Sequence, residues 1–167
     1  MKVFISSLLV ALSFNAFAAN SKVEKKMNAM EPTQMDDLIR GEMAAVRSYT
    51  ALLKDMKDDK VKKQLETIKA NHEVAVSKLK GFASADVKED TTSAGAWGTF
   101  ATTWTKGAKL IGNDTALSAL KQGEEHGINE YKEALADDKI QPELKQMIKT
   151  QFLPKQEEHI KSINALM

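Results

Sequence analysis

Apolar residues recur at alternating steps of three and four positions in four long segments of this 167-residue chain. Such steps return each apolar side chain to the same face of an α-helix, so each segment is predicted to be an amphipathic helix. Helix-forming Ala, Leu, Lys, Glu and Met are abundant, and runs of β-branched residues are scarce. The chain is therefore predicted to be all-α. The apolar stripes run over residues 35–56, 61–82, 117–134 and 144–166.

The connections between these segments indicate how the helices pair. Asp58 and Asp59 end the first segment and are placed to cap the second, and so short a connection favours an antiparallel helical hairpin. A loop at 137–141 precedes Pro142, which stands where the first turn of the fourth helix is expected. Pro154 falls inside that fourth helix and is expected to kink it.

A long connection separates the two predicted hairpins. Residues 83–95 are polar and turn-rich, and residues 96–111 are predicted to form a shorter helix that crosses the bundle, packed by Trp97 and Trp104. The hairpins also form a degenerate repeat at an offset of 82 residues. We therefore expect an antiparallel four-helix bundle with a ferritin-like layout, in which a long crossover with a short helix joins two hairpins. The matching positions are Leu38, Gly41, Glu42, Tyr49 and Leu53 in the first half and Leu120, Gly123, Glu124, Tyr131 and Leu135 in the second.

The N-terminal segment has the order of a secretory signal peptide. Lys2 supplies a positive charge, residues 3–14 form a short apolar run, and Ala16-Phe17-Ala18 is a small-x-small cleavage signature. The run is short for a membrane span, and a chain without cysteine has neither a lipid anchor on an N-terminal cysteine nor a disulfide. We expect a periplasmic or secreted protein. Its predicted parts are a signal peptide at 1–18, a flexible lead-in at 19–32 and the ferritin-like bundle domain at 33–167.

The balance of basic and acidic residues indicates which classes of binding partner are disfavoured. Removing Lys2 with the signal leaves equal numbers of basic and acidic residues, and no basic block stands out. Nucleic acid and anionic membranes are therefore poor partners, and no stable membrane anchor is expected after cleavage. The sequence leaves protein partners and oligomeric state open, a homo-oligomer included.

Four polar residues, one in each predicted helix, interrupt the apolar stripes. Each stands where the helical period calls for a core residue, and a buried carboxylate is costly unless it is paired or bound to metal. Imidazole and carboxylate are ligands of zinc, iron and manganese, so these residues are candidates for a divalent metal site. The candidate ligands are Glu42, His72, Glu124 and His159.

A dinuclear carboxylate site would need more ligands than these. Its pattern places a Glu three residues before each His. Lys69 stands in that position before His72, and Gln156 stands there before His159. A complete di-iron oxidase site is therefore not predicted.

A metal-free interpretation also fits the four residues. Glu42 can accept a hydrogen bond from His72 and Glu124 from His159, with Tyr49 and Tyr131 completing a buried polar layer. The sequence thus leaves two functions open: an exported metal-binding or redox-linked bundle, or a non-catalytic structural or interaction module related to envelope stress. No nucleophile–base pair, phosphate loop or nucleotide motif is visible, so no enzyme activity is assigned.

Methionines near the start of the domain invite a copper interpretation. Exported Met-rich segments can bind soft Cu(I), and methionines stand at positions 27, 30, 35 and 43. Met35 and Met43 fit ordinary helix packing, where methionine is a common filler. Packing is the preferred interpretation.

The order of motifs resembles an uncharacterised bacterial ferritin-like family. Gly95-Ala96-Trp97 with Trp104 is followed by Gln122-Gly123-Glu124-Glu125 and by a His near the end. Members of that family carry a Trp-containing crossover before a Gly-Glu-Asp/Glu helix, and the likeness covers roughly residues 33–166. The resemblance implies a ferritin-related four-helix bundle. It implies no activity, because the family is a domain of unknown function.

Overall fold

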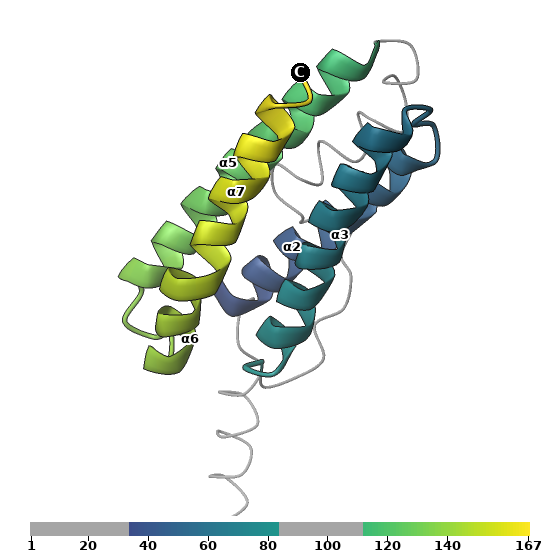
Figure 1. The fold of residues 1–167 in the computed structure, drawn as a ribbon. Coiled ribbons are helices and arrows are strands. Elements are labelled where there is room, and N and C mark those ends of the chain that lie inside the picture. The colour runs from purple at the N-terminus through teal and green to yellow at the C-terminus, as the bar shows by residue number, and fades with distance from the viewer. Residues whose placement is uncertain (1–33, 84–111) are drawn as a thin grey trace, which may run out of the picture. The chain divides into compact units, whose positions relative to one another are not determined.

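The computed structural model describes residues 34–83 and 112–167, and these two ranges contain helices and no strand (Figure 1). The predicted all-α class is confirmed. The six elements lie in one compact unit. They are α2 (Gln34–Leu53), α3 (Asp59–Lys80), α5 (Gly112–Ala136), α6 (Pro142–Met147), the π-helix η2 (Ile148–Phe152) and α7 (Leu153–Asn164).

Several predictions concern parts of the chain outside these ranges. The signal peptide at 1–18, the lead-in at 19–32 and the crossover helix with Trp97 and Trp104 lie outside the described residues. Among the helices that are described, none combines the length and the apolar character needed to span a bilayer.

The turn between α2 and α3 follows the sequence prediction closely. The Asp58 side chain caps α3 by accepting hydrogen bonds from the backbone N–H groups of Lys60 (2.8 Å) and Val61 (3.0 Å). The first apolar stripe outlasts its helix, because α2 ends at Leu53 whereas Met56 is still buried from the connecting turn.

The fourth helical segment is continuous but changes its winding. Pro142 stands in the first turn of α6, as predicted. Ahead of Pro154, the chain widens into η2, where the Leu153 N–H bonds to the Ile148 carbonyl five residues back. A proline ring crowds the carbonyl four residues before it, and the wider turn relieves that crowding. The predicted kink is thus a π turn, and both Gln156 and His159 beyond it are buried.

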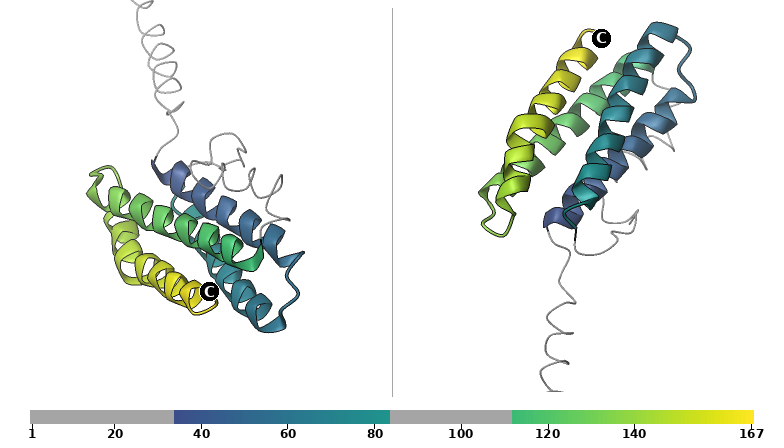
Figure 2. Two further views of the ribbon diagram at one scale, coloured as in Figure 1. Left: turned by 90° about the horizontal axis from the view of Figure 1, so that it is seen from above. Right: turned by 60° about the horizontal axis from the view of Figure 1, so that its bottom comes forward.

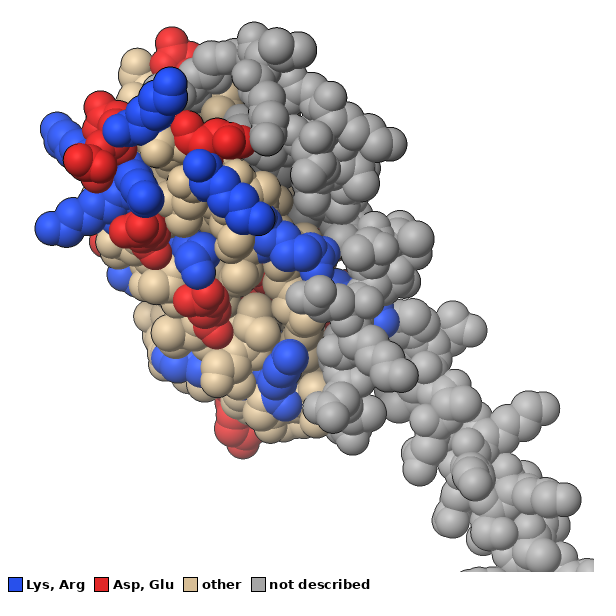
Figure 3. Space-filling view, turned by 90° about the vertical axis from the view of Figure 1, so that its right-hand side faces the viewer, with Lys and Arg blue, Asp and Glu red and all other residues tan. Residues whose placement is uncertain are grey.

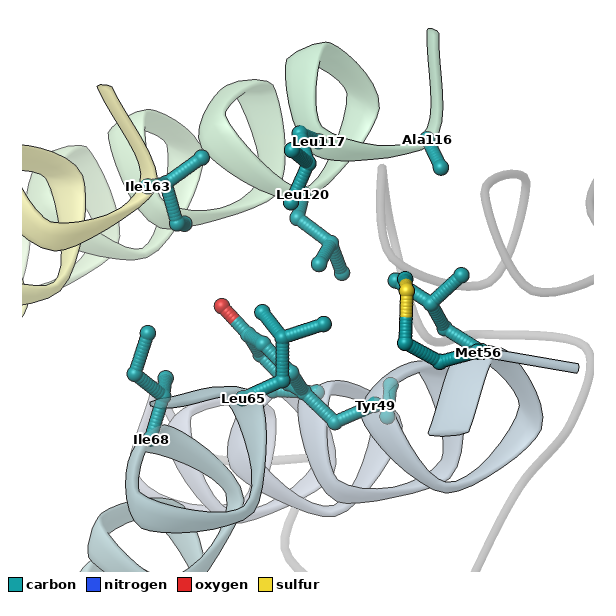
Figure 4. Close-up of a cluster of buried hydrophobic side chains, with 11 residues drawn as sticks. Tyr49, Met56, Leu65, Ile68, Ala116, Leu117, Leu120 and Ile163 are labelled. Carbon is teal, nitrogen blue, oxygen red and sulfur yellow. The ribbon is translucent and has the colours of Figure 1, made fainter. Parts of the chain in front are cut away.

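The helices pack in a chain of neighbours (Figures 1 and 2). α2 packs along α3 and along α5, and α5 packs along α7, whereas α3 and α7 touch over a short stretch. The apolar core falls into two clusters. One joins the C-terminal half of α2 to the N-terminal halves of α3 and α5 and to the end of α7, where Leu65 and Tyr49 face Leu120 and Ile163 (Figure 4). The other joins the opposite ends of these helices around Ile39, and a polar layer lies between the two.

Candidate metal centre

The four residues predicted from the stripes meet in this polar layer. Glu42 comes from α2, His72 from α3, Glu124 from α5 and His159 from α7. None is more than 5% exposed. Groups of this kind stay buried only when they are hydrogen-bonded to one another or to a ligand.

His72 bridges the two carboxylates. Its Nδ1 lies 2.7 Å from Glu42 Oε2 and its Nε2 lies 2.9 Å from Glu124 Oε1. Burial by itself lowers the pKa of His72, but the charges of Glu124 and Glu42 and their hydrogen bonds outweigh it and raise that pKa to about 10. For Glu124, burial by itself raises the pKa, but the charges and hydrogen bonds of His72 and His159 outweigh it and lower that pKa to about 2. His72 is therefore an imidazolium that donates from both ring nitrogens.

The second imidazole has different partners. His159 Nδ1 lies 3.2 Å from Glu124 Oε2, and Asn71 Nδ2 lies 3.1 Å from His159 Nε2. Since an ionised carboxylate only accepts, Nδ1 carries the proton, and the Asn71 amide donates to the lone pair on Nε2. The two histidines thus differ in one partner: His72 has a carboxylate at both ring nitrogens, whereas His159 has a carboxylate at one and the Asn71 amide at the other.

Two tyrosines connect the halves of the repeat crosswise. Tyr49 OH on α2 donates to Glu124 Oε1 at 2.6 Å, and Tyr131 OH on α5 donates to Glu42 Oε1 at 2.7 Å. Burial first, and the neighbouring carboxylates second, raise the pKa of each phenol well above its usual value. Both hydroxyls therefore remain donors at physiological pH. The sequence predicted that both tyrosines join the network. It did not predict that each one bonds the glutamate of the other half of the repeat.

Gln156 is a third donor to Glu42, besides His72 and Tyr131. Its Nε2 lies 3.2 Å from Glu42 Oε1, and its amide lies against Gly127, where a Cβ atom would come within 2.7 Å of Nε2. The sequence identified Gln156 as the position of a missing carboxylate, and the structure gives it a partner. Asn71 was missed. Asn71 directly precedes His72 on α3, and no apolar period marks it as a residue whose side chain reaches His159 on α7, 88 positions away.

Three of the four predicted ligands offer atoms to a common point. One atom each from His72, Glu124 and His159 lies within 4.8 Å of the others, all three residues being buried. Ligands at about 2.0–2.2 Å from an ion stand up to roughly 4 Å apart, so a small closing movement suffices to bind one. Glu42 is not in this group and instead contacts it through His72.

Comparison with known families agrees with the order of the motifs. Residues 30–137 match the family described as Domain of unknown function (DUF2383), which is more than half of the chain. The chain belongs to this family. The DUF2383 match contains Glu42, His72 and Glu124, whereas Gln156 and His159 follow its end. It confirms the predicted resemblance to an uncharacterised family. No protein of curated function and no solved structure matched the chain.

Proposed function

We propose that this DUF2383 protein is an exported helical bundle that binds one divalent transition-metal ion through His72, Glu124 and His159. The observation that carries the proposal is the convergence of these three ligand atoms from three different helices. Imidazole and carboxylate ligands suit zinc, iron and manganese.

The charge of the layer supports a cation. All the contacts of Glu42 in the layer are with donors, as are those of Glu124, and one imidazolium lies between these two carboxylates. Two negative charges against one positive charge leave a buried excess of negative charge, which is unfavourable. Exchanging one proton of His72 for a divalent ion makes the layer neutral, with both histidines as neutral ligands.

The finer fold assignment belongs to the same proposal. The short α2–α3 and α5–α6 connections favour antiparallel pairs, and the repeat at an offset of 82 residues relates those pairs. The crossed tyrosine–glutamate bonds are what a pseudo-twofold, ferritin-like layout would produce. The charged, apolar and small-residue order of residues 1–18 supports export to the periplasm or beyond.

The alternative function is a metal-free structural or interaction module. One observation favours it: the two Glu and two His residues already satisfy one another through short hydrogen bonds. On this alternative, the layer fixes the register of the helices, and the surface binds a protein partner or a second copy.

Thermal melting of chelator-treated protein separates the two functions. An excess of Zn²⁺, Fe²⁺ or Mn²⁺ should raise the Tm by several degrees, because free ion at about 100 times its Kd contributes roughly 2.7 kcal/mol. Glu124→Gln should abolish the rise. Glu125→Gln is the matched control, since this neighbouring side chain is 52% exposed, and it should keep the rise. No rise with any of the three metals would leave the metal-free module as the function.

A further inference from the structure

A groove lies between α3 and α7, which contact each other over only a short stretch. It has a volume of about 440 Å³, with one wall from α3 and the other from residues 150–158 of η2 and α7. Its rim combines Val74, which is 52% exposed, with Lys78 and Gln151, which hydrogen-bond to each other at 2.6 Å. The volume is in the range of small-molecule sites, roughly 300–1,000 Å³.

A small void lies inward of this groove. It measures about 20 Å³, and both imidazoles, Glu42, Tyr131 and Gln156 line it. That exceeds the ~10–15 Å³ that one water needs. The groove and the void are both lined by Asn71, Ala75, Phe152 and Lys155, so these four residues mark where they meet.

Gln156 gives the void a chemical preference. The residue is 4% exposed, and its Oε1 is a buried acceptor with no hydrogen-bond partner in the described part of the chain. Its Nε2 is already used by Glu42. An acceptor left in this state costs about 1–3 kcal/mol, so the void favours a molecule that can donate.

Coordination by His72, Glu124 and His159 leaves a further position on the ion. Zinc sites with three protein ligands keep a fourth position for an exchangeable molecule. Because both imidazoles of the ligand set line the void, a molecule there lies beside the ion as well as beside Gln156. It needs a lone pair for the metal and a hydrogen for the amide oxygen.

We propose that this void binds a small neutral protic molecule, water or a ligand of about two heavy atoms, which reaches the metal through the α3–α7 groove. This inference rests on the proposed metal site. Anions without a hydrogen are disfavoured, because they cannot donate to the unpartnered acceptor of Gln156 and would lie in a void that the Glu42 carboxylate also lines.

The test uses cobalt as the metal and hydroxylamine as the probe. Protein loaded with one equivalent of Co²⁺ should change its visible absorption saturably as hydroxylamine is added, since the spectrum reports the ligands of the ion. Gln156→Leu should weaken the apparent Kd of hydroxylamine about tenfold, the loss of one hydrogen bond to a buried acceptor. The Co²⁺ stoichiometry of the Leu variant should stay at one equivalent, which guards against a folding defect in that variant.

Matched variants test the position and the route. Gln151→Leu changes the same residue type in the outer groove and should leave the hydroxylamine Kd unchanged. Val74→Trp should slow hydroxylamine association severalfold by filling the groove, with little change in the equilibrium Kd. Thr67→Trp, on the same helix outside the groove, should leave the rate unaffected.

The outcomes separate this inference from the metal site. Stoichiometric Co²⁺ binding with no spectral response to hydroxylamine would overturn the ligand position and leave the metal site standing. Equal hydroxylamine affinities in wild type and Gln156→Leu would overturn the role of Gln156. Protein that binds no Co²⁺ would overturn both proposals.

Discussion

The two imidazoles of the layer differ in the partner on the far side of the ring. His72 has a carboxylate on both sides and holds two protons, whereas His159 has Glu124 on one side and the Asn71 amide on the other. An amide can turn to present either its NH₂ or its oxygen. Asn71 can therefore donate to Nε2 of His159 before an ion binds and accept from it afterwards.

Metal binding should consequently release about one proton per ion. His72 loses the proton on Nε2 and keeps the one that Nδ1 donates to Glu42. His159 keeps its proton, which moves from Nδ1 to Nε2 and is accepted by the turned Asn71 amide. Calorimetric titration with Zn²⁺ at pH 8, in buffers of different ionisation enthalpy, counts the protons. A count of zero would contradict the imidazolium state of His72.

At the level of the helices, the sequence reveals which positions face the core but not the local winding of a helix or the partners of its side chains. The stripe period located Glu42, His72, Glu124 and His159, because four breaks in an apolar pattern are visible without a structure. The π turn was not predictable in the same way, since Pro154 indicates a disturbance but not whether the helix bends or widens. Nor was the crossing of Tyr49 and Tyr131, because spacing along one helix does not say which neighbouring helix a hydroxyl reaches.

Two glycines of the packed helices should respond oppositely to the same substitution. At Gly41 an added Cβ would meet Glu130 Oε2 at 2.8 Å, and the Glu130 side chain is 24% exposed and can swing outward. Gly41→Ala should therefore gain up to about 1 kcal/mol from helix propensity. At Gly127 the Cβ would meet the buried Gln156 amide, which can move away only by giving up its hydrogen bond to Glu42. Gly127→Ala should lose roughly 1–3 kcal/mol.

Urea denaturation of both variants measures these changes from the shift in midpoint at constant slope. Because each protein differs from wild type by the same added methyl group, each serves as the control for the other. Equal stabilisation by the two substitutions would show that Gln156 is not held against Gly127.

In the described part of the chain, residues 34–83 and residues 112–167 complete each other's polar layer. Each half supplies a Glu and a His, and each half's tyrosine bonds the other half's carboxylate. On the face shown in Figure 3, Lys and Arg lie intermixed with Asp and Glu, whereas the charges of the polar layer are buried. The layer is then a principal source of the pH dependence of folding.

The metal-free protein should be most stable at mildly acidic pH. The pKa of His72 rises from 6.5 to about 10 on folding, so its contribution is complete below pH 6.5 and is lost as the pH climbs towards 10. The pKa of Glu124 falls from 4.5 to about 2, so its contribution is present above pH 4.5 and is lost in stronger acid. Burial, with Glu42, Asp37 and Glu133, raises the pKa of Glu130 to about 7, which adds a decline as the pH rises from 4.5 through 7.

Thermal melts from pH 3 to pH 10 in the presence of chelator should therefore show a Tm that falls steadily on the alkaline side. His72→Gln should lower the Tm at pH 6 and flatten the slope of Tm against pH between pH 7 and pH 10. The reason is that the variant lacks the imidazole that binds a proton more tightly in the folded than in the unfolded state. The slope is the informative quantity, since any buried substitution lowers the Tm itself. His126→Gln removes a histidine that is 35% exposed on α5 and contacts Glu130, whose pKa is about 7, so this variant should keep the wild-type slope between pH 8 and pH 10. Parallel curves for wild type and His72→Gln above pH 7 would mean that His72 does not carry its extra proton in the folded protein.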